Sequence, residues 1–209
     1  ASNYNITYLP YNGTVVKATL TYTAANQSVQ YGTSVVTVTG AGTSTIAGFV
    51  NSETSTVVSG TVSYSTNYTA LSLPGTSGLV VTPVLTGLSA QNYSFSAVSG
   101  TVNVGRKTLT VNGSVAAGKI YDGTTTVNIS GGTLVGVVGS DVVALTQTGS
   151  FVDRNVSRTS ASDTNALPKS IVASFTISGA DTFKYTLQQP ILSAKIHCRR
   201  LTVTALSFS

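Results

Sequence analysis

The sequence repeats itself at long range. A tyrosine is followed 16 residues later by a leucine at three places, namely Tyr4 to Leu20, Tyr93 to Leu109 and Tyr185 to Leu201. The three tyrosines are 89 and then 92 residues apart. A period of this size with constant internal spacing is typical of tandem arrays, in which each unit is one small folded module. The spacing therefore predicts successive domains of one kind rather than a single large core.

Superposing the copies extends the match and sets the domain boundaries. Three further stretches correspond in the same order: Tyr31-Gly32 with Tyr121–Gly123, Gly48–Glu53 with Gly136–Asp141, and Gly87–Tyr93 with Ser178–Tyr185. We expect two complete repeats, residues 18–106 and 107–199. Residues 1–17 correspond to the closing strands of a preceding repeat, and residues 200–209 to the opening strand of a following one.

The composition favours β-structure and restricts the possible functions. Charged residues make up 8% of the chain, compared with about 25% in an ordinary globular protein. Serine and threonine together account for 62 of 209 residues. Threonine and valine suit a pleated sheet because they branch at Cβ. The sequence has no apolar stretch long enough to span a membrane, which excludes insertion through a helix.

The charged and reactive residues indicate neither nucleic-acid binding nor catalysis. The formal charge is +5, but Lys17 and Glu53 are the only charged residues before residue 106, and no dense basic stripe follows. Cys198 is the only cysteine, so neither a disulfide nor a Cys-based metal site is expected. His197 and Cys198 are adjacent on an expected strand and would point to opposite faces. We therefore expect no enzyme activity, cofactor, metal or nucleic-acid partner.

Short apolar runs of period two predict strands with one buried face. They occur at Val35–Thr39, Thr61–Tyr64, Leu79–Thr82, Tyr93–Ala97, Val142–Thr146 and Ile171–Ile177. Between the runs lie turn residues, among them Asp122-Gly123, where we expect the carboxylate to accept backbone N–H bonds and glycine to adopt positive φ. The predicted fold class is all-β, with tandem small domains, Ig-like or β-grasp-like, arranged as an extended rod.

The second repeat resembles a known family. Tyr121-Asp122-Gly123-Thr124-Thr125, followed by Gly132–Asp141 and Ser178–Asp181, is similar to the YDG-type repeat. The first repeat resembles the related MBG-type repeat. Both types occur in filamentous-haemagglutinin-like bacterial surface adhesins, which are exported by outer-membrane partner proteins. The resemblance implies an extracellular, all-β stalk at the cell surface, with no catalytic residues to carry over.

Asparagine supplies candidate modification sites. Eight of the twelve asparagines begin an N-x-S/T triplet, whereas a random arrangement would give fewer than four. This excess makes N-glycosylation a candidate, although the repeat itself multiplies such triplets. The eight residues are Asn5, Asn12, Asn26, Asn67, Asn92, Asn112, Asn128 and Asn155.

Three functions remain open. The first is a non-enzymatic stalk segment of a surface adhesin or extracellular filament, whose partners are neighbouring repeats. The second is a self-assembling subunit in which loose terminal strands add to the sheet edges of other copies. The segments for such pairing contain Tyr4, Ile6, Tyr8, Val15, Leu201, Val203 and Leu206. The third is a carbohydrate-binding module for host or matrix glycans, which would need exposed tyrosines. Most tyrosines recur at repeat positions such as Tyr93 and Tyr185, which indicates a place in the core.

Overall fold

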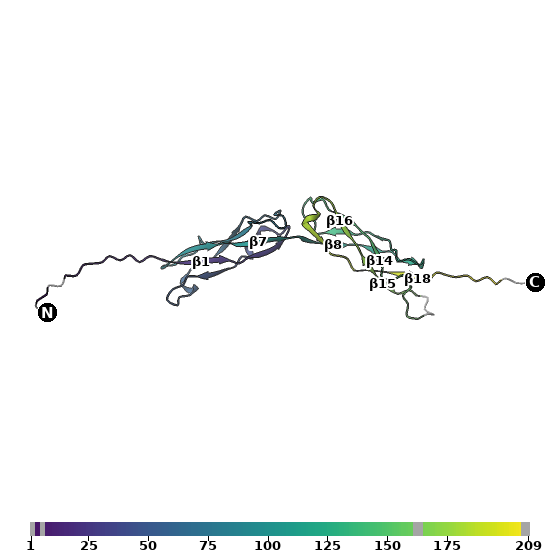
Figure 1. Cartoon of the computed structure of the whole chain (residues 1–209), viewed down its shortest axis with the longest axis horizontal. Coiled ribbons are helices and arrows are strands. Elements are labelled where there is room, and N and C mark those ends of the chain that lie inside the picture. Colours follow the sequence, from purple (N-terminus) through teal and green to yellow (C-terminus); the bar gives the residue numbers. More distant parts are fainter. Residues whose placement is uncertain (1–2, 5–6, 161–164, 206–209) are drawn as a thin grey trace, which may run out of the picture. The chain divides into compact units, whose positions relative to one another are not determined.

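The structure, a computed structural model, describes residues 3–4, 7–160 and 165–205, and these divide into two compact units (Figure 1). The first unit holds the described residues as far as Val29, together with Thr33–Ala70 and Thr76–Asn103. The second holds Gln30–Gly32, Leu71–Gly75 and the described residues from Val104 onward. Two short segments from the first repeat thus belong to the second unit.

The first repeat folds into seven strands, a short α-helix and a 3-10 turn (Figure 1). The elements are β1 (Ala18–Ala24), β2 (Gln27–Gln30), α1 (Val35–Gly40), β3 (Ser44–Ala47), the 3-10 turn Ser55–Val57, β4 (Ser63–Thr66), β5 (Val80–Val84), β6 (Tyr93–Val98) and β7 (Gly100–Gly105). They form two sheets, with strand orders β3-β1-β6 and β2-β7-β5-β4. Leu20, Tyr22 and Tyr93 form the buried cluster of the three-stranded sheet.

The second repeat contains eleven strands, several of them only two or three residues long. They are β8 (Lys107–Asn112), β9 (Val115–Ala116), β10 (Lys119–Ile120), β11 (Ile129–Ser130), β12 (Thr133–Val135), β13 (Ala144–Thr146), β14 (Gly149–Phe151), β15 (Pro168–Ala173), β16 (Thr176–Ser178), β17 (Tyr185–Leu187) and β18 (Leu192–His197), with a 3-10 turn at Thr182–Lys184. Phe151, Ile171, Ala194 and Ile196 form a buried cluster.

The two main sheets of each unit share one strand order, and the second unit adds the two-stranded sheets β11-β9 and β13-β16. The sheets β12-β8-β17 and β10-β18-β15-β14 of the second repeat follow the orders of β3-β1-β6 and β2-β7-β5-β4. In both three-stranded sheets the central strand runs antiparallel to one neighbour and parallel to the other. The register is also the same. Tyr93 pairs with Ala18, two residues before the buried Leu20, and Tyr185 pairs with Lys107, two residues before the buried Leu109. Tyr93 thus lies on the strand parallel to that of Leu20, and Tyr185 on the strand parallel to that of Leu109.

One predicted strand is a helix. The period-two run Val35–Thr39 predicted a strand, but α1 covers Val35–Gly40. Ser34 caps this helix, because its side chain accepts a hydrogen bond from the Thr37 N–H (3.1 Å). Only Val38 of the helix is fully buried. The strand prediction was wrong because capping and one tertiary contact outweighed the β-propensity of Val and Thr.

A second predicted strand is interrupted. The run Ile171–Ile177 forms β15 and β16, with Ser174 and Phe175 between them. The side-chain amide of Gln189 accepts from the Phe175 N–H and donates to the Phe175 carbonyl oxygen, both at 2.8 Å. Gln189 therefore takes the hydrogen-bonding role of a neighbouring strand, which allows the chain to change sheets here without losing backbone hydrogen bonds.

We expect Gly48→Ala to destabilise the first unit more than Gly78→Ala does. Both glycines have positive φ, +107° and +76°, so both substitutions introduce strain of about 1–3 kcal/mol. A Cβ on Gly48 would also lie 2.2 Å from the Thr19 carbonyl oxygen, whereas Gly78 faces open space. Urea unfolding followed by tyrosine fluorescence measures the difference. Equal losses for the two variants would contradict the steric argument.

Candidate functional site

The same polar contact occurs in both units, where the hydroxyl of a buried tyrosine donates a hydrogen bond to a carboxylate. In the second unit the Tyr185 hydroxyl donates to Asp141 Oδ2 (2.5 Å) and accepts from the Val138 N–H (2.9 Å). In the first unit the Tyr93 hydroxyl donates to Glu53 Oε2 and accepts from the Val50 N–H (3.1 Å). We call each of these sets a tyrosine–carboxylate pair.

Local structure positions each acid for this contact. A turn brings the N–H of Glu53 to the Val50 carbonyl (3.0 Å) and the N–H of Asp141 to the Val138 carbonyl (3.1 Å). Each turn therefore places the carboxylate beside the valine N–H three residues earlier in the chain. One tyrosine hydroxyl can then reach both groups. Phe49 packs edge-on against Tyr93, with 5.9 Å between ring centroids.

The pairs keep the phenols neutral and the aspartate charged. Burial raises the pKa of Tyr185 to about 12, assisted by the hydrogen bond to Asp141. The hydrogen bond to Glu53 raises the pKa of Tyr93. Burial alone would raise the pKa of Asp141, but hydrogen bonds from Lys184 and Tyr185 outweigh it and hold that pKa below its ordinary value. These groups are thus set for stable hydrogen bonding rather than proton transfer at neutral pH.

Lys184 extends the pair of the second unit into an ion network. Its ammonium lies 2.8 Å from Asp141 Oδ1 and 2.8 Å from Asp181 Oδ1. Hydrogen bonds to Asp141 and Asp181 raise the pKa of Lys184, so it remains charged. Asp181 also accepts from the Val142 N–H (2.7 Å). The first repeat has Asn92 and Ser89 at the positions of Lys184 and Asp181, so its pair lacks this network.

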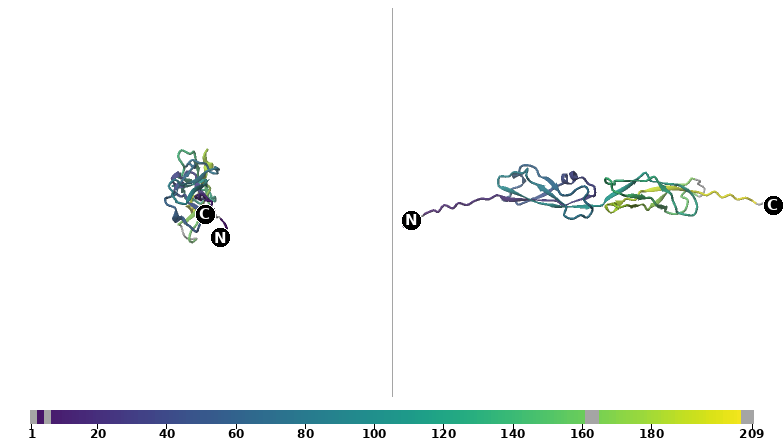
Figure 2. Two further views of the ribbon diagram at one scale, coloured as in Figure 1. Left: turned by 90° about the vertical axis from the view of Figure 1, so that its left-hand side faces the viewer. Right: turned by 90° about the horizontal axis from the view of Figure 1, so that it is seen from above.

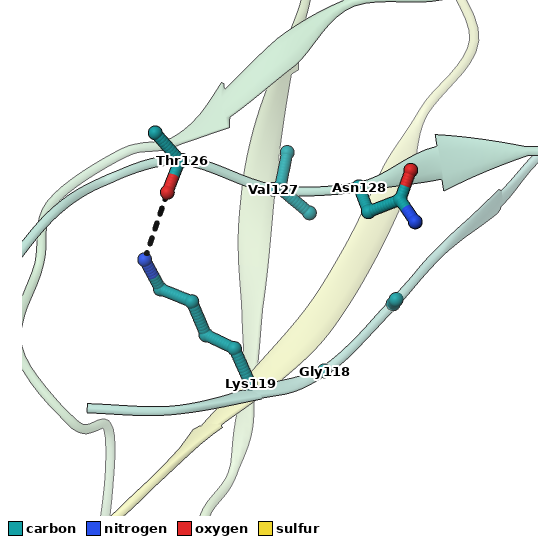
Figure 3. Close-up of a pocket in the computed structure, with 6 residues that line it drawn as sticks. Gly118, Lys119, Thr126, Val127 and Asn128 are labelled. Atoms are coloured by element: carbon teal, nitrogen blue, oxygen red, sulfur yellow. Dashed lines mark hydrogen bonds between the residues drawn. The ribbon is translucent and has the colours of Figure 1, made fainter. Parts of the chain in front are cut away.

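The YDG turn, Tyr121–Gly123, is organised by one lysine, Lys119. Lys119 donates to Asp122 Oδ1 (2.9 Å) and to the Thr124 carbonyl (2.8 Å), and Figure 3 shows it reaching toward Thr126. Asp122 accepts from the Thr124 N–H (2.9 Å), and Gly123 has a φ of +81°. The predicted Asp-Gly turn is therefore confirmed. The hydrogen bonds from Lys119 and Thr124 lower the pKa of Asp122 to about 2.

A second lysine uses the same geometry. Lys169 donates to Asp153 Oδ1 (2.5 Å) and to the Asn155 carbonyl (2.6 Å), while Asp153 accepts from the Asn155 N–H (2.8 Å). In both turns the aspartate carboxylate accepts a hydrogen bond from the backbone N–H two residues later in the chain. The lysine ammonium donates both to this carboxylate and to the backbone carbonyl of that later residue. These charges therefore fix loop geometry.

The candidate glycosylation sites fall into two groups. Asn5 lies outside the described residues, and the other seven asparagines are exposed. Asn67 has a structural role, because its amide donates to the Gly78 carbonyl (2.9 Å) and accepts from the Val80 N–H (2.8 Å). Asn26 similarly accepts from the Thr101 N–H (2.8 Å). Glycosylation stays a prediction, and Asn12, Asn92, Asn112, Asn128 and Asn155 are the sites with the least structural conflict.

The terminal segments expose their apolar side chains. No strand occurs in residues 7–17 or 198–205, and Figure 2 draws both as extended chain. Tyr4, Tyr8, Val15, Leu201 and Val203 are all exposed. Ile6 and Leu206 lie outside the described residues. By the tyrosine spacing Val15 corresponds to Val104 and Ile196, both of which are buried.

The described residues can be compared with two simple requirements, a cluster of metal ligands and a helix able to cross a membrane. Within residues 3–4, 7–160 and 165–205, no three His, Cys, Asp or Glu side chains gather closely enough to hold a metal ion. No helix in that part of the chain is both long and apolar enough to cross a bilayer. Cys198 is exposed, and its sulfur accepts a hydrogen bond from Arg158 (3.7 Å).

These features define a mostly β-stranded chain that contains two units of one arrangement, fixed by tyrosine–carboxylate pairs. Residues 105–192 match the family model of the YDG domain. The second unit therefore contains a YDG-type repeat. No curated protein matches the chain, and no solved structure does.

Sequence reasoning identified the YDG turn but not the tyrosine–carboxylate pairs. It assigned Tyr93 and Tyr185 to the core, which is where they lie, each about 2% exposed. The partners of their hydroxyls are 40 and 44 residues distant in the chain. The available signal was the alignment of Glu53 with Asp141, because the first repeat contains no other acid.

We expect Tyr185→Phe and Tyr93→Phe to destabilise their own units by about 1–3 kcal/mol, since each leaves a backbone N–H and a carboxylate oxygen without this partner. Amide hydrogen exchange would show the loss locally, as faster exchange at Val138 in Tyr185→Phe and at Val50 in Tyr93→Phe. Tyr11→Phe is the matched control, because Tyr11 is 93% exposed. Unchanged protection at Val138 and Val50 would show that the hydroxyls contribute nothing.

The YDG turn should lose stability in acid. Because the pKa of Asp122 is lower in the folded chain, its contribution is fully present above the ordinary pKa of 3.8 and is lost as pH falls toward about 2. Asp122→Asn retains an acceptor for the Thr124 N–H but removes the charge beside Lys119. Wild type should therefore be more stable near neutral pH, and the difference should vanish at the acid end. Thermal unfolding across this range tests it, and a difference independent of pH would contradict the assignment.

Proposed function

We propose that this chain is a non-enzymatic structural repeat segment of a secreted bacterial surface adhesin or extracellular filament. The observation that carries the proposal is duplication. Two units share sheet order, strand register and the tyrosine–carboxylate pair, although the first is almost free of charge. Selection that preserves architecture while the surface changes is characteristic of repeats that supply length.

The use of charge in the second unit supports the same proposal. Asp122, Asp141, Asp153 and Asp181 each contact a lysine through a defined loop geometry. Such contacts fix turns, whereas an active site brings an acid, a base or a nucleophile together in a cavity. The YDG-type repeat in residues 105–192 and the likeness of the first repeat to the MBG type favour an adhesin of the filamentous-haemagglutinin kind.

A test in the source cell separates a stalk from other roles. Antibodies against residues 18–199 should label intact cells, and external protease should remove that label. Deleting one repeat, residues 107–199, from the native protein should preserve export but bring a distal epitope closer to the cell surface in immunogold images. Retention of the protein inside intact cells, or an unchanged epitope distance, would overturn the proposal.

A second candidate is a subunit joined by strand complementation. The exposed Val15 favours it, because the corresponding residues of the two units, Val104 and Ile196, lie in strands. These terminal segments correspond to β1, β6 and β7 only, so pairing them would still leave out the counterparts of β2 to β5. The stalk therefore explains more of the chain.

The carbohydrate-binding module has less support. It requires exposed aromatic rings on a fixed surface. The three exposed tyrosines, Tyr4, Tyr8 and Tyr11, lie in the segment before β1, whose described residues form no strand. The other seven tyrosines are buried or half-buried.

A further inference from the structure

The strands β5 and β15 are equivalent, and their residues can be compared one by one. Val81 pairs with Gly100 in the first unit, and Ile171 pairs with Leu192 in the second. Gly100 and Leu192 each lie seven residues after the tyrosine of the tyrosine–carboxylate pair in their repeat. Val81 and Ile171 therefore occupy the same position in the two sheets.

A glutamine completes the backbone hydrogen bonds just beyond β15. Leu85 and Phe175 follow the two paired residues by four positions, so they are equivalent as well. In the second unit the Gln189 carboxamide accepts from the Phe175 N–H and donates to the Phe175 carbonyl oxygen, both at 2.8 Å. One side chain thus satisfies both backbone groups of a residue that is 3% exposed.

The first unit lacks this carboxamide. Ala97 stands at the position of Gln189, because each lies four residues after the tyrosine of its repeat. The Leu85 carbonyl oxygen accepts from the Leu88 N–H (3.0 Å), which leaves it a second lone pair. No group of the described residues accepts from the Leu85 N–H. The backbone at Leu85 is therefore open where that at Phe175 is closed.

A shallow groove lies at this open position. It is lined by Thr82, Pro83 and Leu85 on one side and by Phe95 and Ala97 of β6 on the other. β6 is an edge strand of its sheet, Ala97 is exposed and Phe95 is half-buried. All the lining residues are uncharged. The groove therefore suits a neutral polar group, because it offers an ion no opposite charge.

We infer that this groove binds the carboxamide side chain of a glutamine on an uncharged, extended partner peptide. The carboxamide oxygen accepts from the Leu85 N–H, and the carboxamide nitrogen donates to the Leu85 carbonyl oxygen, as the Gln189 groups do at Phe175. The small side chain of Ala97 leaves the space that the glutamine stem requires. The inference goes beyond the proposed structural role, which needs only length, and assigns the first unit a binding site.

NMR spectra of the isotope-labelled whole chain test the binding. The probes are capped tripeptides in which glutamine, glutamate or leucine stands between two alanines. The glutamine peptide should shift the Leu85 amide resonance saturably and bind at least about fivefold more tightly than the leucine peptide, as two ordinary hydrogen bonds predict. The glutamate peptide should bind no better than the leucine peptide, because a carboxylate has no N–H to donate.

Ala97→Gln supplies the carboxamide from the chain itself. It should slow hydrogen exchange of the Leu85 amide at least about fivefold, because the new side chain accepts from it, and it should prevent binding of the glutamine peptide. Ala97→Leu is the matched control, since leucine fills the groove without forming hydrogen bonds. Ala97 is exposed, so both variants should fold.

Gln189→Ala makes the reverse change in the second unit. The glutamine peptide should then also shift the Phe175 amide resonance, which it leaves unchanged in the wild type. Equal shifts from the three peptides, no shift at Leu85, or exchange at Leu85 as fast in Ala97→Gln as in Ala97→Leu would overturn the inference. None of these results affects the stalk, which the cell-surface experiment tests separately.

Discussion

Each unit depends on one hydroxyl group that donates and accepts at the same time. The tyrosine begins the strand that runs parallel to the first strand of its repeat, and its O–H reaches a carboxylate on the turn that follows β3 or β12. A single side chain thereby connects its own strand with the turn that follows the opposite edge strand of the sheet, because the valine N–H lies on that same turn. Its ring is buried, so the hydroxyl must find partners inside the protein. This requirement explains why tyrosine, an acid and a valine N–H recur together.

Around this shared framework the two units obtain stability in different ways. The first has almost no charge and caps its turns with neutral groups, such as the Asn67 amide and the Ser34 hydroxyl. The second uses lysine–aspartate contacts at three of its loops. Only the lysine of the third contact, Lys184, also reaches the tyrosine–carboxylate pair and the ring of Tyr31. The repeat thus tolerates extensive change in charge as long as backbone groups remain satisfied.

Period two predicted the strands well where one face of a strand is buried along its length, as in β5. It was wrong for Val35–Thr39, where a serine cap and one buried valine favour a helical turn. It also missed the interruption after Ala173, because the group that replaces the neighbouring strand there is a glutamine side chain 14 residues further along. Alternation of apolar residues reports which face is buried but not which group supplies the backbone hydrogen bonds.

The sequence by itself determined the repeat, the β-rich character, the buried tyrosines and the Asp-Gly turn, because spacing, propensity and turn chemistry are local properties. Tertiary structure alone decided the partners of the tyrosine hydroxyls, the lysine that organises each acidic turn and the contrast between Tyr31 and Tyr121. These depend on residues that folding brings together from distant parts of the chain. Tyr31 and Tyr121 occupy equivalent positions in the two repeats of the sequence. Only the tertiary structure shows that the first ring is buried and the second half-buried.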